Sequence, residues 1–204
     1  MQIEQIPVGQ MKANCYILWD KKGEAIVIDP GDDADLIIRH IQSNDLTPRL
    51  ILGTHGHFDH LMSVLELKLA FSIPFYLHKD DEFLLDRLDK TAMHFLRLDP
   101  GPPPDIEVFL KNKADIKVGD ISLKVIHTPG HTPGSVTLYN KKEDAAFVGD
   151  LIFKDGLVGR TDFSYSDEDE LKSSIRHILK LPSKTKIFSG HGEATEVHSL
   201  LGTL

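Results

Sequence analysis

The 204-residue sequence has one cysteine, no long uninterrupted apolar run, and fewer basic than acidic residues. One cysteine cannot form an intramolecular disulfide or a cysteine-based zinc finger. The longest mostly apolar stretch, 62–77, contains Glu66 and Lys68 and is too short for a membrane span, so no membrane contact is expected. With 23 Lys and Arg against 31 Asp and Glu, the net charge is −8, which argues against a nucleic-acid partner.

The N-terminus lacks the features of a secretory signal. Residues 1–7 contain neither a basic region nor a long apolar one, and together with the single Cys15 this predicts a cytoplasmic protein. Hydrophobic residues make up 41% of the chain and charged residues 26%, which is typical of a folded globular protein. The length predicts one domain over residues 1–204.

Histidine, by contrast, is abundant, with 11 residues, and it is the commonest metal ligand in proteins. His55, His57, Asp59 and His60 fall within six residues, directly after an apolar stretch that predicts a strand. In extended backbone His55 and His57 point the same way and can share one ion, whereas Asp59 and His60 lie past the turn and can face a second. A polar loop with chance histidines is the alternative, but four such groups in six residues argue against it. Imidazoles and carboxylates without thiolates suit Zn, Mn or Fe.

Apolar periodicity predicts a chain of strands interrupted by a few helices. The predicted strands are 3–8, 14–19, 25–28, 49–52, 74–77, 117–119, 122–126, 135–140, 145–148 and 186–188, and the predicted helices are 32–43, 61–71, 80–88 and 167–179. Strand meanders outnumber βαβ units, so we expect two sheets with helices packed outside rather than a doubly wound parallel sheet. The proline-rich segment 98–104 predicts a surface loop, either a plain connector or a lid.

Three later predicted strands also run into glycine-rich loops that carry histidine or aspartate. These loops hold His127 and His131, Asp150, and His191. Glycine permits close backbone approach at the mouth of a site, so all of these loops could meet at one edge of the sheets. Cys15 lies within a predicted strand and is expected to be a small core residue.

In order and spacing, these segments resemble the metallo-β-lactamase superfamily over nearly the whole chain. The resemblance implies an αββα sandwich with a dinuclear metal site between the sheets. It assigns His55, His57 and His131 to the first metal, Asp59, His60 and His191 to the second, and Asp150 as the bridge between them. His127 is expected to pack near the site or support it rather than bind metal. Two bridged ions would acidify a shared water and polarise a carbonyl, and Asp59 would orient the metal-bridging hydroxide as the catalytic residue.

Within that superfamily the chain looks most like short glyoxalase II proteins, the hydroxyacylglutathione hydrolases. The motifs 54–60, 127–135 and 159–163, with Gly149-Asp150 followed by Phe153, carry this likeness. It implies a thioesterase that cleaves a small hydroxyacyl thioester of the S-lactoylglutathione type. Arg160 would contact substrate or form an ion pair with Asp162. The chain ends 13 residues after His191, so we expect no helical C-terminal substrate domain, and the thiol carrier stays open.

An alternative activity follows from Gly159-Arg160-Thr161-Asp162-Phe163, which also resembles the persulfide dioxygenases of the same superfamily. Those enzymes would use one iron, held here by His55, His57, His131 and Asp150. Because every group of the second site is retained, the dinuclear hydrolase is favoured, with two divalent ions, zinc first and iron or manganese as alternatives. A lactonase or a non-enzymatic scaffold is a weaker reading. The sequence does not specify the acyl group, the thiol carrier or the oligomeric state.

Overall fold

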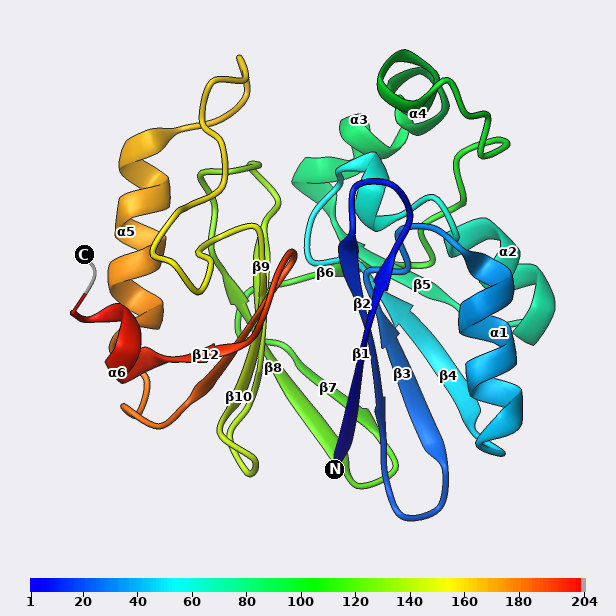
Figure 1. Ribbon diagram of the computed structural model, residues 1–204, viewed down its shortest axis with the longest axis horizontal. Helices are drawn as coiled ribbons and strands as arrows, with labels where there is room; N and C mark the ends of the chain where they lie inside the picture. The colour runs from blue at the N-terminus through cyan, green and yellow to red at the C-terminus, as the bar shows by residue number, and fades with distance from the viewer. Residues whose placement is uncertain (203–204) are drawn as a thin grey trace.

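Two six-stranded β-sheets stack face to face in the protein, seen here in a computed structural model (Figure 1). The structure describes residues 1–202, so residues 203–204 of the predicted domain lie outside the described residues. The first sheet has the order β1 (Gln2–Val8), β2 (Ala13–Trp19), β3 (Glu24–Ile28), β4 (Thr47–Leu52), β5 (Phe75–His78) and β6 (Val108–Leu110). The second has the order β12 (Thr195–Glu196), β11 (Lys186–Ser189), β10 (Ala145–Gly149), β9 (Val136–Asn140), β8 (Ile121–His127) and β7 (Asp115–Val118).

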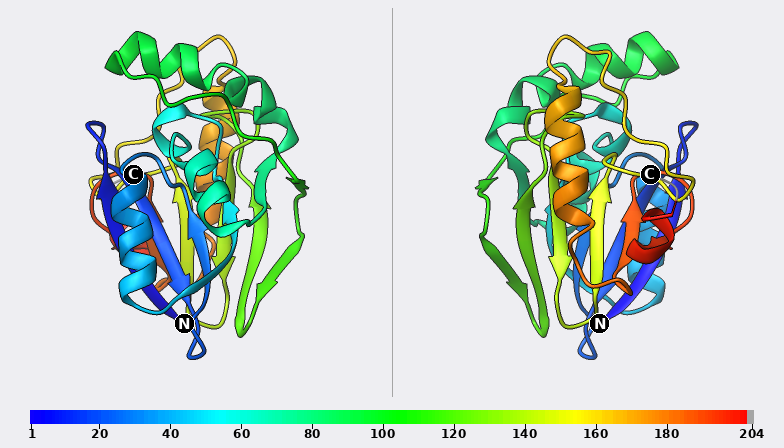
Figure 2. Two further views of the ribbon diagram at one scale, coloured as in Figure 1. Left: turned by 90° about the vertical axis from the view of Figure 1, so that its right-hand side faces the viewer. Right: turned by 90° about the vertical axis from the view of Figure 1, so that its left-hand side faces the viewer.

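Helices cover both outer faces of this pair of sheets. α1 (Ala34–Ser43) and α2 (Val64–Phe71) lie on the first sheet, and α5 (Glu168–Ile178) and α6 (Val197–Leu200) on the second. α3 (Glu82–Leu85) and α4 (Leu88–Leu96) sit at one end of the sandwich (Figure 2). Two single-turn 3₁₀ helices, η1 (Phe58–His60) and η2 (Lys79–Asp81), complete the elements. The predicted αββα sandwich is confirmed.

The alternation of side chains along the strands explains why the sheets pack in this way. In β2, Cys15 and Ile17 face the cluster beneath α1 and α2, while Tyr16 and Leu18 face the opposite sheet. Successive strand residues point to opposite faces, so a strand that is apolar throughout requires cover on both sides. A third apolar cluster, which includes Leu171, fills the space between the second sheet and its helices.

The strand directions place the loops that matter for function at one edge of the sandwich. β3, β4, β5 and β6 run parallel to one another, and β10 runs parallel to β11. Carboxyl ends of parallel strands meet at the same edge of a sheet. The predicted meander is right for β7 to β10, which are antiparallel, but wrong for half of the first sheet.

Several predicted elements differ from the structure in extent or existence. The helix expected at 61–71 begins only at Val64, because the η1 turn uses the residues just before it. The helix expected at 80–88 is divided between η2, α3 and the start of α4, and the rest of α4 was not predicted. β6, β12 and α6 were also missed; each is four residues or shorter and takes its shape from its packing partner.

Across the described residues, no helix combines the length and the apolar character needed to cross a membrane.

Candidate metal centre

Four strand-end loops bring the predicted ligands together between the two sheets. The loop after β4 supplies four of them, and the loops after β8, β10 and β11 supply one each. Two of the resulting groups have ligand atoms within 4.8 Å of one another: His55, His57 and His131, and Asp59, His60 and His191. All seven predicted ligands therefore converge on one region, although they lie as far as 136 residues apart in the chain (191 − 55).

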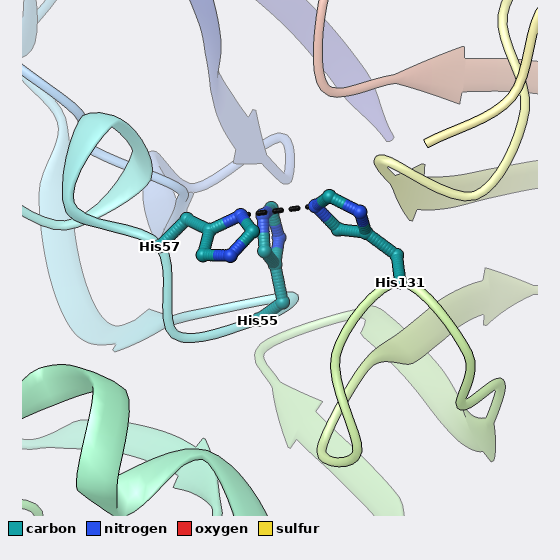
Figure 3. Close-up of side chains that lie close together, drawn as sticks. All are labelled: His55, His57 and His131. Atoms are coloured by element: carbon teal, nitrogen blue, oxygen red, sulfur yellow. Dashed lines mark hydrogen bonds between the residues drawn. The ribbon is translucent and has the colours of Figure 1, made fainter. Parts of the chain in front are cut away.

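The first group consists of three imidazoles that face one another (Figure 3). His57 Nδ1 and His131 Nε2 lie 2.9 Å apart. The centroid of the His55 ring is 4.9 Å from the centroid of the His57 ring and 5.1 Å from that of the His131 ring. His55 and His57 come from one loop of the first sheet, whereas His131 arrives from the second. The group is complete only when both sheets are in place.

The second group adds carboxylates, and Asp150 lies between the two groups. His60 Nε2 and His191 Nε2 are 3.3 Å apart, and His191 Nε2 is 3.5 Å from Asp59 Oδ2. Asp150 Oδ2 is 3.7 Å from His131 Nε2 and 3.7 Å from His191 Nε2, and so from one histidine of each group. This position suits a carboxylate that bridges two ions.

Each of the five histidines has its other ring nitrogen held by a neighbouring oxygen. The pairs are His55 Nδ1 with Thr54 Oγ1 at 3.1 Å, His57 Nε2 with Tyr165 Oη at 2.9 Å, His60 Nδ1 with Asp29 Oδ2 at 3.3 Å, His131 Nδ1 with the Arg160 carbonyl at 2.8 Å, and His191 Nδ1 with the Lys12 carbonyl at 3.3 Å. Such contacts fix the tautomer and ring orientation of metal-binding histidines. The nitrogen left over points in every case toward the shared centre.

Unpartnered polar atoms give an independent test of whether metal ions fit here. His55 Nε2 and Asp150 Oδ1 are buried and have no hydrogen-bond partner among the described residues. Leaving a buried polar atom unpaired costs about 1–3 kcal/mol, so such atoms need a partner the chain itself does not provide. Both atoms belong to predicted ligands. The residues present thus fit two metal ions, one for each group with Asp150 between.

The two groups differ in charge because their surroundings differ. Burial and then the neighbouring His131 lower the pKa of His57 to about 3, and burial lowers the pKa of His131 as well, so the first group consists of neutral imidazoles. Burial also opposes the charged form of His60, but the Asp59, Asp150 and Asp29 carboxylates outweigh it and raise its pKa to about 10. Metal ions bind neutral imidazole and ionised carboxylate, so an ion at the second group would displace the proton of His60.

Sequence reasoning missed residues that support the ligands. Asp29 follows β3, is buried, and accepts hydrogen bonds from the Thr54 backbone N–H at 2.7 Å and its hydroxyl at 2.6 Å, besides facing His60. The position of Asp29 in the sequence could have identified it as a supporting residue, because an acidic residue at the end of a buried strand needs partners. Asp81 and Tyr165 gave no such signal.

His127 lies outside both groups, as expected. Its Nε2 donates to the Pro133 carbonyl at 2.9 Å, and its ring stacks on His78 with centroids 4.5 Å apart and planes 11° from parallel. With Asp80 these two histidines form a further cluster of metal-ligand type. A ring nitrogen binds metal in the plane of its ring, and two stacked planes do not meet at one ion.

A cavity of about 330 Å³ opens onto both groups. His57, Asp59, His131, Asp150 and His191 form its floor, and Arg160 lies in its wall. The Arg160 guanidinium makes two contacts with Asp162, at 2.9 and 2.6 Å, and lies over the Phe163 ring. The described residues that line the cavity include none from the proline-rich loop 98–104; α4, just before that loop, contributes instead.

Comparison with known proteins agrees with this geometry. The model of the metallo-β-lactamase superfamily matches residues 8–191. A hydroxyacylglutathione hydrolase (GloC) from Haemophilus influenzae is 36% identical over 97% of this chain and 93% of its own. The crystal structure of the B3 metallo-β-lactamase BLEG-1 has a TM-score of 0.92 and 36% identity, and covers 98% of this chain and 97% of its own. TTHA1623 in a di-iron-bound form has a TM-score of 0.90 and 33% identity, and covers 98% of each chain.

The family match spans most of the chain and includes every residue of the two ligand groups. This protein therefore belongs to the metallo-β-lactamase superfamily.

Proposed function

We propose that this protein is a cytoplasmic metal-dependent thioesterase that hydrolyses a small hydroxyacyl thioester of the S-lactoylglutathione type. The observation that carries the proposal is the pair of ligand groups joined by Asp150 beneath an open cavity. The 36% identity to a hydroxyacylglutathione hydrolase over nearly the whole chain supports this choice of substrate. When bound, two divalent ions, zinc being our first choice and iron or manganese the alternatives, acidify water and polarise a carbonyl oxygen.

The residues of the chain divide the remaining work. Asp59 is buried at the cavity floor, and His60 and His191 outweigh its burial and keep its pKa well below the ordinary range, so it is ionised. An ionised carboxylate there can accept a hydrogen bond from the attacking water and orient it. A thiolate, whose ordinary pKa is about 8.5, leaves without a strong general acid, so the chemistry requires no further proton donor. We assign Arg160, at the cavity wall, to contact with the substrate.

Persulfide oxygenation is a second candidate, supported by the loop that carries Arg160 and Asp162. A single iron with three histidines and Asp150 would leave Asp59, His60 and His191 without a ligand role. Those three groups converge as closely as the first set, which favours the hydrolase. Hydrolysis of β-lactams is a third, supported by the 36% identity to BLEG-1.

A substrate panel on metal-quantified protein tests the proposal. We expect two metal ions per chain and thiol release from S-lactoylglutathione, and we expect His57→Ala to lower kcat by about 100-fold or more. His198→Ala, which alters an exposed histidine in α6, is the matched control and should retain full activity. One iron per chain with oxygen uptake on a persulfide would refute the proposal, as would activity unaffected by His57→Ala.

A further inference from the structure

Most of the cavity wall outside the predicted ligands is apolar, and its polar side chains are Thr91, Arg160 and Tyr165. Six side chains form what we call the apolar wall: Met11, Phe58, Phe95, Phe153, Val158 and Phe163. Several of them remain open to solvent, with Met11 46% exposed, Val158 40% and Phe95 57%. Exposed apolar groups gathered around a cavity indicate that a ligand covers them.

Two pairs of stacked aromatic rings stand within this cavity. Phe58 and Phe95 stack with centroids 5.8 Å apart and planes 4° from parallel. Phe163 and Tyr165 stack at 5.2 Å and 8°. The first pair comes from η1 and α4 in the N-terminal half of the chain, and the second from the loop between β10 and α5. Flat faces of this kind bind aromatic or otherwise apolar groups through contact area and ring packing.

Apart from the metal ions that the ligand groups would hold, the cavity offers few charged partners to a charged carrier. Among the described residues that line it, Arg160 is the one Lys or Arg side chain. Its guanidinium is already paired with the Asp162 carboxylate through two hydrogen bonds and lies 4.8 Å from the Phe163 ring centre. Glutathione carries two carboxylates and one ammonium group, and each would need a partner on entering the site. Arg160, which we assign to substrate contact, would have to leave Asp162 to pair with one carboxylate, and the described lining provides no second Lys or Arg for the other.

We propose that the site selects thioesters whose thiol carrier is uncharged and apolar, an aromatic thiol above all, over those of a charged peptide thiol. This inference rests on the proposed thioesterase function: it keeps the small hydroxyacyl group and replaces glutathione as the preferred carrier. The reaction is hydrolysis: the carbon–sulfur bond breaks, the acyl carbon gains the hydroxyl group of water, and the remaining proton ends on the thiol. The apolar wall holds the carrier, and the acyl carbonyl lies above the ligand groups.

A matched pair of substrates isolates the carrier. S-lactoylglutathione and the S-lactoyl ester of benzyl mercaptan share one acyl group and differ in the thiol. Initial rates of thiol release are measured on protein shown to hold two metal ions per chain. We expect kcat/KM to be at least about tenfold higher for the benzyl thioester, with the difference in KM, because burial of a phenyl group in an apolar wall strengthens binding by about that factor or more.

Phe95→Ala and Phe109→Ala test whether the wall is responsible. Phe95 lines the cavity from α4, whereas Phe109 is a partly exposed phenylalanine in β6 outside it. Phe95→Ala should reduce the preference for the benzyl thioester about tenfold, and Phe109→Ala should leave the preference unchanged. Thermal unfolding of both variants verifies that they are folded, and Phe95 is sufficiently exposed for truncation to be tolerated.

The possible outcomes distinguish failure of the carrier preference from failure of the proposed thioesterase function. Equal or better hydrolysis of S-lactoylglutathione overturns the inference and leaves the thioesterase proposal standing. A benzyl preference that Phe95→Ala does not reduce also overturns it, because the wall would then not be the cause. Failure of metal-loaded protein to hydrolyse either thioester refutes the proposed function itself.

Discussion

One of the oxygens that hold the five predicted ligand histidines belongs to a phenol. Tyr165 Oη lies 2.9 Å from His57 Nε2, and burial raises the pKa of Tyr165 to about 12, so the phenol stays neutral. When His57 Nε2–H donates to this oxygen, Nδ1 keeps its lone pair and faces His131 Nε2. Tyr165 therefore acts as a positioning residue for His57, in addition to its place in the cavity wall.

Tyr165→Phe should weaken metal binding without harming the fold. The variant keeps the ring stacked on Phe163 and removes only the hydroxyl, so His57 loses the contact that selects its tautomer. We expect metal affinity at the first group to fall about 10- to 100-fold, measured by competition with a chromogenic chelator. The control is Tyr139→Phe, which removes a phenol of β9 that donates to Asp144. Equal affinity in both variants would show that Tyr165 does not position His57.

Among the structural elements, η2 joins two of the ligand loops. Asp81, fully buried in η2, accepts hydrogen bonds from Gly56 N–H at 2.7 Å, Gly134 N–H at 2.6 Å and the Thr132 hydroxyl at 2.6 Å. Gly56 lies between two ligands of the first group, and Thr132 follows the third. Asp81 thus holds together the loops that come from opposite sheets, although it is not itself a predicted ligand.

Asp81→Asn should destabilise the protein and loosen the first ligand group. An amide offers one acceptor oxygen and turns an NH₂ toward the remaining donors, so at least one buried donor is left unpaired. We expect a loss of about 1–3 kcal/mol in the free energy of unfolding, together with weaker metal binding. Urea unfolding and chelator competition measure the two effects. Asp80→Asn, an exposed neighbour, should change neither appreciably, and an unaffected Asp81→Asn would contradict this role.

Some elements could not be read from the chain because they depend on their neighbours. α4 buries only Leu88 and Ala92, too few positions for a helical period to stand out. β6 has three residues, follows a proline-rich loop, and pairs with β5 alone. Longer elements, such as β2 and α5, were predicted within one or two residues, because their apolar pattern is local and repeated.

At the scale of the whole molecule, the candidate metal centre lies across the junction of the sheets. Asn14 and Tyr16 of β2 both donate to the Ser189 carbonyl of β11, at 2.9 and 2.6 Å, next to the centre. The ligands likewise come from both sheets, so a bound ion resists their separation. A ligand that binds only the folded state stabilises that state. The gain is about 2.7 kcal/mol when the free ligand concentration is one hundred times Kd.

Removal of metal should therefore make the protein easier to unfold. The reactivity of the Cys15 thiol measures this unfolding. Cys15 is the single cysteine; it is fully buried in β2, and burial raises the pKa of its thiol, so it should react only in the opened chain. We expect chelated protein to be labelled by a thiol reagent at lower urea concentrations than metal-loaded protein. Restored zinc should reverse the shift. Identical labelling curves would mean that metal binding is not linked to folding.

The linear sequence alone predicted the seven candidate ligands and their order, and it determined the class of fold. Those features are local: a buried strand, a glycine-rich loop, and histidine or aspartate at its end. The tertiary structure alone decided what surrounds the ligands. Tyr165 reaches His57 across 108 residues, Asp81 reaches Thr132 across 51, and the apolar wall gathers side chains from four separate segments. Contacts of this kind depend on how the sheets and helices pack, and no local pattern of residues records them.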